Sequence, residues 1–304
     1  MSRRNELQVF LRGGLGNQLF QYSTGLAIAE KTGRELIIRG DLLPEIEDSI
    51  GGVSRWPNQI SSFNHSGVVR TNSFQPASKT NLLGKSMQAM RALGDAFPSV
   101  SRSLGWLASE KTLNTNHPRV DSTRLINSYS PYKYLAWSNR ARLRNELSSI
   151  VDPTDRFIEL SAEINRTPTI AIHLRQGDYL RLQHIFGKPS INYFRAALEY
   201  LESSSVSHRV WLFTDSPDST PPELLNLLNP ALVIGPEVLS KPIENLVLMG
   251  SGSGLVAANS SFSWWANLIS EEGVPVVAPR ISGAIVSNFE VGNEPNQKLE
   301  FLDA

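Results

Sequence analysis

Apolar and polar positions form a recognisable pattern near the start of the chain. An apolar run at residues 7–12 predicts a strand, the spacing in residues 18–31 predicts a helix, and residues 35–39 predict a second strand. Glycine-rich residues 13–16 lie between the first strand and the helix. The chain therefore opens with a strand–helix–strand unit, which is typical of α/β proteins.

The middle of the chain has a weaker pattern. Residues 42–120 are rich in Ser, Asn, Pro and Gly and predict only short periodic pieces. A strand is expected at residues 124–128, and apolar positions at helical spacing predict helices at 139–150 and 153–165. The elements that follow are more clearly marked.

From residue 169 onward, strands and helices take turns. The expected strands lie at residues 169–174, 208–214, 231–234, 254–258 and 274–278, and the expected helices at 191–202, 222–228, 242–249 and 263–272. This alternation predicts a parallel sheet with helices on its faces. A chain of 304 residues is long enough for two domains, which we expect at residues 1–150 and 151–304.

Charge and composition argue against several classes of partner and of chemical site. Lys plus Arg and Asp plus Glu both number 29, so no overall basic field favours a nucleic-acid partner. The chain has no cysteine, which excludes disulfides, thiolate zinc sites and cysteine nucleophiles. The N-terminus lacks the apolar core of a signal peptide, and no apolar run approaches the roughly 20 residues that span a bilayer. We expect a soluble, cytoplasmic protein.

The first candidate site follows the expected strand at 169–174. His173, Arg175 and Asp178 lie at or just past its C-terminal end. Ligands of open α/β sheets bind outside the carboxyl ends of the strands, so this cluster is well placed to meet one. The alternative is that Arg175 and Asp178 pair with each other and cap the strand.

The second candidate site is the glycine-rich loop before the first helix. Its residues are Gly14, Gly16, Asn17 and Gln18. Free backbone N–H groups at a helix start favour an anion. The loop resembles a dinucleotide fingerprint imperfectly, because Leu19 stands where a third small residue is needed, while Asp41 resembles the ribose-binding acid. An oxidoreductase, a tight turn and simple helix capping therefore remain alternatives.

The third candidate site surrounds the start of the expected helix at 263–272. Its residues are Asn259, Ser260, Ser261 and Ser263. Hydroxyls, an amide and helix N–H groups together form a possible phosphate cradle. Alternatively Ser261 or Ser263 caps the helix. We favour ligand contact for the serines, because one cap suffices, and a core position for Trp264 and Trp265.

The remaining candidate is Asp215, which follows the expected strand at 208–214. Its carboxylate could bond to a ribose or a base, or cap the next turn. No metal site is expected, because the chain has no D-x-D sequence and its histidines are scattered. A bound diphosphate would therefore be neutralised by Arg175, the serine loop and helix termini.

Several of these segments carry a family resemblance. They are GGLGNQLFQY (13–22), YSPYKYL (129–135), HLRQGDY (173–179), FTD (213–215), ENLVLMG (244–250) and ANSSFSWWANLI (258–269). Their order and spacing resemble glycosyltransferase family 11, the α-1,2-fucosyltransferases. NSSFSWW is the most specific of these signals.

The resemblance implies two Rossmann-like domains facing a cleft, the GT-B type. It implies that residues 151–304 bind the donor substrate GDP-L-fucose, that residues 1–150 meet the acceptor, and that no cofactor is needed. The family's donor-diphosphate motif maps onto His173, Arg175 and Asp178. Its G-N-Q loop maps onto Gly14, Gly16, Asn17 and Gln18, and its serine-rich loop onto Asn259, Ser260, Ser261 and Ser263.

Two positions depart from the family pattern. Gln176 stands where the family usually has a second arginine, and this replacement removes a fixed charge that would contact phosphate. A charge-assisted contact contributes about 1.5 to 3 kcal/mol, so donor affinity and donor identity are open to question. Asn245, where the family often has Asp, is a smaller change.

The function expected from the resemblance is metal-independent, inverting transfer of L-fucose to the 2-hydroxyl of a terminal galactose-like residue. Arg175 and the serine hydroxyls would stabilise the departing GDP. Asp178 is the first candidate for the general base and His173 the second, while Asn17 would orient the acceptor or the leaving phosphate. The expected partners are a nucleotide sugar and an oligosaccharide acceptor.

Three rival functions remain. The chain could use another GDP-sugar, it could be a non-catalytic sugar-binding relative, or it could be a dinucleotide-dependent oxidoreductase that uses the glycine-rich loop and Asp41. The acceptor glycan, the oligomeric state and a peripheral attachment to the inner membrane face are left open by the sequence.

Overall fold

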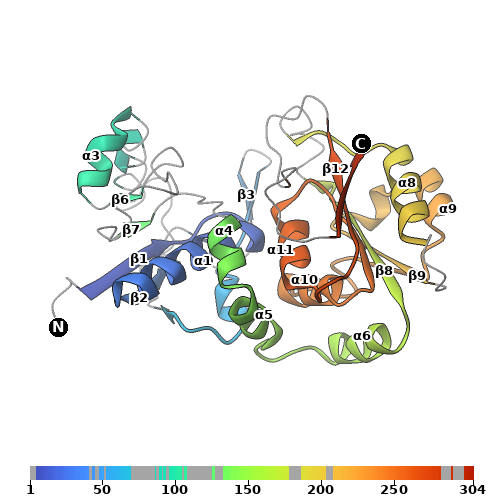
Figure 1. The fold of residues 1–304 in the computed structure, drawn as a ribbon, viewed down its shortest axis with the longest axis horizontal. Helices are drawn as coiled ribbons and strands as arrows, with labels where there is room; N and C mark the ends of the chain where they lie inside the picture. Colours follow the sequence, from blue (N-terminus) through green and yellow to red (C-terminus); the bar gives the residue numbers. More distant parts are fainter. Residues whose placement is uncertain are drawn as a thin grey trace. The chain divides into compact units, whose positions relative to one another are not determined.

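The computed structural model describes residues 5–40, 43–44, 48–50, 53–69, 86, 89–90, 92–93, 96–104, 106–107, 125–126, 133–177, 186–202, 208–281, 289 and 298–304. The chain divides into two compact units, Met1–Val151 and Asp152–Ala304. Each unit contains a parallel β-sheet with helices packed against it (Figure 1). The expected α/β class is therefore confirmed.

The first unit is built on a five-stranded parallel sheet with the order β5-β2-β1-β7-β6. These strands are β1 (Glu6–Phe10), β2 (Glu35–Arg39), β5 (Val68–Val69), β6 (Trp106–Leu107) and β7 (Leu125–Ile126). Alternation along β1 puts Leu7 and Val9 fully into the core, and Val9 lies opposite Ile38 of β2. A separate antiparallel hairpin joins β3 (Asp48–Ile50) and β4 (Val53–Arg55).

Helix α1 (Leu15–Thr32) is the central helix of this unit. It begins after Gly14, and Gly33 ends it in the left-handed conformation at φ 64°. The Tyr22 hydroxyl donates to Glu146 at 2.5 Å, which ties α1 to α5. The other helical elements of the unit are η2 (Ile60–Ser62), α3 (Pro98–Ser103), α4 (Lys133–Ser138) and α5 (Arg140–Ser148).

The second unit is built on a six-stranded parallel sheet with the order β10-β9-β8-β11-β12-β13. The strands are β8 (Thr169–Leu174), β9 (Arg209–Thr214), β10 (Leu232–Ile234), β11 (Gly254–Val256), β12 (Val276–Arg280) and β13 (Leu299–Asp303). All six residues of β8 are buried, as its apolar run at residues 170–172 predicts for a strand covered on both faces. β8 is therefore the central element of this unit.

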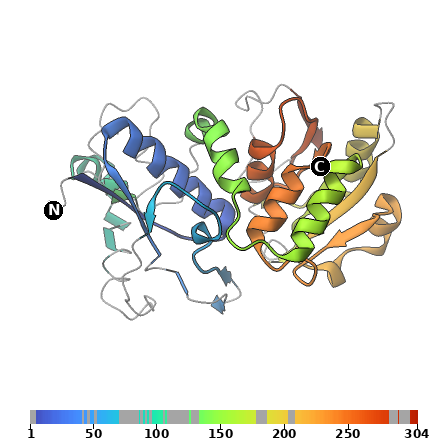
Figure 2. The ribbon, with the colours of Figure 1, turned by 90° about the horizontal axis from the view of Figure 1, so that it is seen from below.

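Helices cover both faces of this sheet (Figures 1 and 2). They are α6 (Asp155–Arg166), α8 (Ile191–Glu202), α9 (Pro222–Leu228), α10 (Pro242–Gly250) and α11 (Ser261–Ile269), with a short turn η6 (Pro217–Ser219). α8 and α9 lie together on one face, and α6, α10 and α11 lie on the other. The buried Glu244 carboxylate of α10 accepts from the Thr154 N–H at 2.7 Å and from its hydroxyl at 2.9 Å, and Thr154 caps α6.

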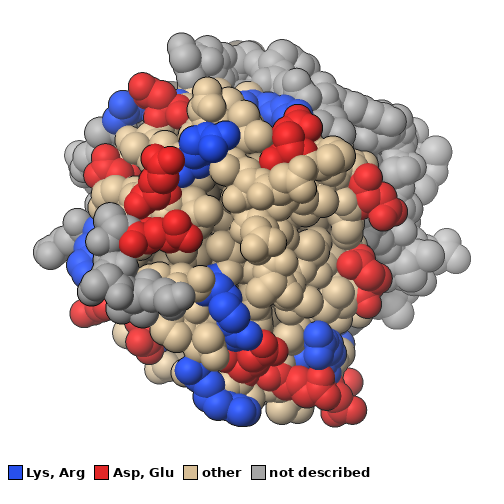
Figure 3. All heavy atoms as spheres, turned by 90° about the vertical axis from the view of Figure 1, so that its right-hand side faces the viewer, with Lys and Arg blue, Asp and Glu red and all other residues tan. Residues whose placement is uncertain are grey.

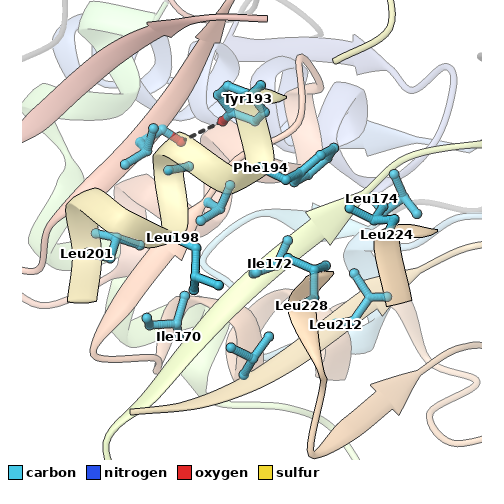
Figure 4. Close-up of a cluster of buried hydrophobic side chains, with 14 residues drawn as sticks. Ile170, Ile172, Leu174, Tyr193, Phe194, Leu198, Leu201, Leu212, Leu224 and Leu228 are labelled. Atoms are coloured by element: carbon cyan, nitrogen blue, oxygen red, sulfur yellow. Dashed lines mark hydrogen bonds between the residues drawn. The ribbon is translucent and has the colours of Figure 1, made fainter. Parts of the chain in front are cut away.

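Apolar side chains of α8 form the core between this helix and the sheet. Figure 4 shows Phe194 and Leu198 of α8 in one cluster with Ile172 of β8 and with residues of β9 and α9. The buried Tyr193 hydroxyl lies 2.7 Å from the Ala257 carbonyl oxygen and 3.1 Å from that of Val277. These hydrogen bonds hold the start of α8 against β12 and the residues that follow β11.

The boundaries observed after residue 150 are close to those expected. The strand at 169–174 and the helices at 191–202 and 222–228 have the expected bounds. Helix α11 begins at Ser261 instead of residue 263, because Ser260 is its cap. Strand β13 was not expected from the sequence.

Charged groups of both signs alternate on the face shown in Figure 3, which is seen from the right-hand side of Figure 1. They surround a broad area without charge. No single-sign field is visible on this face, as the equal numbers of acidic and basic residues suggest.

Candidate active site

The strand order of the second unit reverses between β8 and β11. From β8 the chain proceeds to β9 and β10 on one side, and then returns to β11 on the other side of β8. Open α/β sheets bind ligands outside the carboxyl ends of the strands at such a point. Residues 173–177 form the end of β8 and the loop after it, and residues 257–263 follow β11.

Arg175 and Asp215 form an ion pair at this edge of the sheet. Asp215 follows β9, the neighbour of β8, and its Oδ2 lies 2.5 Å from Arg175 Nη1. Its other oxygen accepts the backbone N–H of Gln176 at 2.8 Å. About a fifth of each charged side chain is exposed, since the two values are 20% and 21%. The pair therefore fixes the guanidinium while leaving it in reach of a ligand.

Gly177 allows the chain to turn beside this ion pair. A Cβ atom at this position would lie 2.5 Å from Asp215 Oδ2, the oxygen that binds Arg175. The backbone φ is +21°, at the border of the region that L-residues rarely adopt. A glycine is therefore required here by the close approach of the carboxylate.

The Gln176 side chain is used inside the protein. Its Nε2 donates to the Ser219 carbonyl at 2.9 Å, its Oε1 accepts from the Thr214 hydroxyl at 3.3 Å, and the residue is 3% exposed. The amide thus anchors the loop after β8 to the turn after β9. Gln176 therefore stabilises the loop, although it lacks the charge of the arginine that the family usually has at this position.

His173 and Ser263 meet across the gap between β8 and α11. His173 Nδ1 lies 2.5 Å from Ser263 Oγ, which also accepts the Ala258 N–H at 3.0 Å. Both side chains are buried. The hydrogen bond between His173 Nδ1 and Ser263 Oγ joins β8 to the first turn of α11, and the imidazole tautomer decides which of the two atoms donates.

His173 is neutral at physiological pH. Burial, with a smaller contribution from the nearby Arg175 charge, lowers the pKa of His173 to about 3. A group with so low a pKa accepts a proton weakly near neutrality, which gives little support to a role as general base. Its described contacts instead link β8 to the start of α11.

The serines of the third candidate site have different surroundings. Ser260 Oγ caps α11 by accepting the N–H groups of Phe262 at 3.1 Å and Ser263 at 3.3 Å. Asn259 Nδ2 donates to the Phe186 carbonyl at 2.8 Å. Ser261 is half-buried, and its hydroxyl has no hydrogen bond to the described part of the chain. Ser261 is therefore the serine whose hydroxyl is best placed to meet a ligand.

The two tryptophans that follow are fully buried. Trp264 and Trp265 have 0% exposure and pack edge to face with centroids 5.4 Å apart. Their predicted core position is confirmed.

A pocket opens at the point where the strand order reverses. Its lining residues are His173, Leu174, Arg175, Gln176, Gly187, Lys188, Pro189, Phe194, Ala258 and Asn259. The sequence-based reading did not single out Gly187 or Lys188, which precede α8 in a segment without periodic pattern. A glycine followed by a cation, within four residues of the start of a helix, is the signal that was available there.

The glycine-rich loop belongs to the first unit. Gln18 is fully buried, where it donates to the carbonyls of Gly13 at 2.8 Å and Pro57 at 2.9 Å and accepts the Gln59 N–H at 2.8 Å. It holds the loop together. Asn17 is half-buried, and no side-chain hydrogen bond joins it to a described residue.

The other residues of this loop lie at the helix start. Gly14 is the N-cap of α1, with the Trp56 ring next to it, since a Cβ on Gly14 would lie 3.4 Å from the indole. Gly16 is buried within the first turn of α1. The loop therefore offers Asn17, and not Gln18, to a ligand.

Asp178 and Asp41 lie outside the described residues.

Among the residues that the structure does describe, no group of three or more His, Asp or Glu is arranged to hold a metal ion. No helix in the same part of the chain is both long and apolar enough to cross a membrane.

Two relatives from Escherichia coli match most of the chain. The O-antigen biosynthesis glycosyltransferase WbnK is 23% identical over 285 residues, covering 89% of this chain and 92% of that protein. An alpha-1,2-colitosyltransferase is 25% identical over 262 residues, covering 84% of each chain.

The fold is also similar to that of a solved fucosyltransferase complex. The crystal structure of POFUT1 with GDP-fucose superimposes with a TM-score of 0.51 at 15% sequence identity, covering 91% of this chain and 98% of the other. The model of glycosyl transferase family 11 matches residues 108–298, which include the pocket and the segments that form it. This match extends over more than half of the sequence, and the chain belongs to glycosyl transferase family 11.

Proposed function

We propose that the chain is a metal-independent, inverting α-1,2-fucosyltransferase that moves L-fucose from GDP-β-L-fucose to the 2-hydroxyl of a terminal galactose-type acceptor. The observation that carries the proposal is the pocket of the second unit. It combines a positioned guanidinium with the start of a helix, at the reversal of strand order, in a member of glycosyl transferase family 11.

The pocket offers several groups to a nucleotide diphosphate. Arg175 supplies positive charge to the pocket, and its bond to Asp215 holds the guanidinium in place. Ser261, two residues past the lining residue Asn259, would add a hydroxyl at the start of α11, where the helix dipole also favours an anion. The POFUT1 complex shows that a fold of this kind can hold GDP-fucose in that protein.

The proposed reaction is a single displacement at the anomeric carbon. The acceptor oxygen forms a bond to C1 of fucose while the bond from C1 to the β-phosphate oxygen breaks, and its electron pair leaves with GDP. Arg175 stabilises the negative charge that develops on the departing diphosphate. The hydroxyl proton passes to a base, for which Asp178 is our first candidate. His173, with its lowered pKa, is the second.

The proposal gives the two units different roles within a GT-B fold. The unit Asp152–Ala304 binds the donor, and the unit Met1–Val151 meets the acceptor, with Asn17 as its orienting residue. Gln18, Ser260 and Ser263 act by shaping their loops, because their polar atoms already have partners. A cytoplasmic location, with peripheral attachment to the inner membrane face left open, belongs to the same proposal.

A second candidate is transfer of a sugar other than fucose. The E. coli relative that matches 84% of this chain is named as an alpha-1,2-colitosyltransferase, which transfers colitose. A direct comparison of GDP-L-fucose with GDP-colitose therefore measures which donor this chain prefers.

The test is release of GDP from GDP-L-fucose, measured with EDTA present against a panel of galactose-terminated oligosaccharides. GDP-colitose and GDP-mannose serve as competing donors. We expect acceptor-dependent release with GDP-L-fucose and a product whose α-1,2 linkage is assigned by NMR. A requirement for added divalent metal would contradict the metal-independent mechanism.

Other outcomes distinguish the rivals. Faster turnover of GDP-colitose would support the second candidate. Binding of GDP without turnover of any donor would identify a non-catalytic relative. Binding of NAD at the glycine-rich loop, with no affinity for GDP, would support an oxidoreductase.

A further inference from the structure

The polar side chains that line the pocket differ in whether they already have partners within the protein. Arg175 is paired with Asp215, and the amide of Gln176 is bonded to Ser219 and Thr214. His173 is buried and bonded to Ser263, so it adds no charge. Among the described lining residues, Lys188 is the remaining charged side chain.

Lys188 is exposed and has neither an ion pair nor a hydrogen bond with any described residue. It precedes α8, whose first turn is capped by Ser190, where Oγ accepts the Tyr193 N–H at 3.3 Å. A lysine ammonium on its flexible stem can follow a ligand, in contrast to a guanidinium that is held by a carboxylate.

The backbone conformation at Gly187 positions Lys188 beside the pocket. Gly187 has φ +69°, and a Cβ there would lie 2.2 Å from Cγ2 of Ile281. Only glycine combines this left-handed conformation with so close a contact. The loop is thereby held against the residue that follows β12, with Lys188 at the pocket.

We infer that Lys188 binds the phosphates of the donor nucleotide and supplies the mobile positive charge of the site. This inference deepens the proposed function and rests on it. The ligand class is a nucleoside diphosphate, because one fixed guanidinium and one mobile ammonium on a helix N-terminus match two adjacent phosphates. Gln176 can therefore serve as a structural anchor without leaving the diphosphate with a single cation.

The test measures dissociation constants for GDP and for guanosine by calorimetry, with wild type, Lys188→Gln, Lys188→Arg and Lys241→Gln. Lys241 belongs to the same unit but lies beside Asp152, 3.6 Å away, and not in the pocket. For Lys188→Gln we expect GDP affinity to fall about tenfold, guanosine affinity to stay constant, and the salt dependence of GDP binding to weaken. Lys188→Arg should remain within about threefold of wild type, because it keeps the charge.

The inference is overturned if Lys188→Gln binds GDP within about twofold of wild type, or if GDP and guanosine are weakened equally. In both cases wild-type turnover of GDP-fucose still stands, so the proposed function survives. If wild type binds no GDP and releases none from GDP-sugars, the proposed function and this inference fail together. An unchanged thermal midpoint in each variant shows that the comparison is between folded proteins.

Discussion

Arg175→Ala is expected to reduce kcat/KM for fucosyl transfer about 100-fold or more. The reason is that a positioned donor aimed at the developing charge of a leaving group contributes roughly 10²–10³ in rate. The free energy of unfolding should fall by about 1 kcal/mol or less, because the pair with Asp215 is partly exposed. Initial rates of GDP release and urea unfolding of the same preparations measure both quantities.

Two further variants make this result specific. Arg175→Lys keeps the charge but loses the planar fork, so an intermediate rate is expected. Arg209→Ala also removes an arginine–carboxylate pair, the one with Glu163 at 2.6 Å, but at the opposite end of β9. Its transfer rate should match that of wild type once the protein is folded. Equal losses for Arg175→Ala and Arg209→Ala would show that Arg175 acts only on stability.

Ser263→Ala is expected to lower the free energy of unfolding by about 3 kcal/mol. The variant leaves two buried groups without their partner, the N–H of Ala258 and Nδ1 of His173. Each such group costs about 1–3 kcal/mol when it is left unsatisfied. Transfer should also slow in the folded fraction, because the His173 ring loses the bond that orients it beside Arg175.

The neighbouring serines provide matched controls for this loss. Ser260→Ala removes a helix cap and should cost about 1 kcal/mol. Ser261→Ala removes a hydroxyl without a described partner and should change stability by less than about 0.5 kcal/mol. The expected order of destabilisation is therefore Ser263, then Ser260, then Ser261. If Ser261→Ala destabilises as much as Ser263→Ala, the assigned roles of the serines are wrong.

The same serines also separate structure from binding. Ser261→Ala should weaken GDP binding while leaving stability constant, since its hydroxyl is the one available to a ligand. The sequence favoured ligand contact for all the serines, on the ground that one cap suffices. The structure gives Ser263 a partner that the sequence could not indicate, because His173 lies 90 residues earlier in the chain.

The second sheet was predictable because its sequence repeats a strong local pattern. Short apolar runs, such as residues 170–172, and helices with one apolar face predicted the order of elements up to β12. Strand β13 was missed because its residues are only partly buried, and its short sequence LEFLD has little apolar contrast. Its pairing with β12 depends on a tertiary contact.

The location of the site was also predictable, but its internal bonds were not. Arg175 and Asp215 were each expected at the carboxyl end of a strand, and parallel neighbours bring such ends together. The sequence suggested Asp178, which lies outside the described residues, as a partner of Arg175, and the adjacency of β8 and β9 adds Asp215 as another. Gln176 and Lys188 depend in the same way on loop conformations that local patterns do not encode.

The central claim is that the donor binds at the reversal of strand order in the second unit. Hydrogen–deuterium exchange with and without GDP tests it directly, with NAD as the control ligand. We predict that GDP slows exchange in peptides covering residues 173–177 and 257–263, and that NAD changes neither. Protection confined to residues 13–18, or the same protection by NAD, would contradict the account.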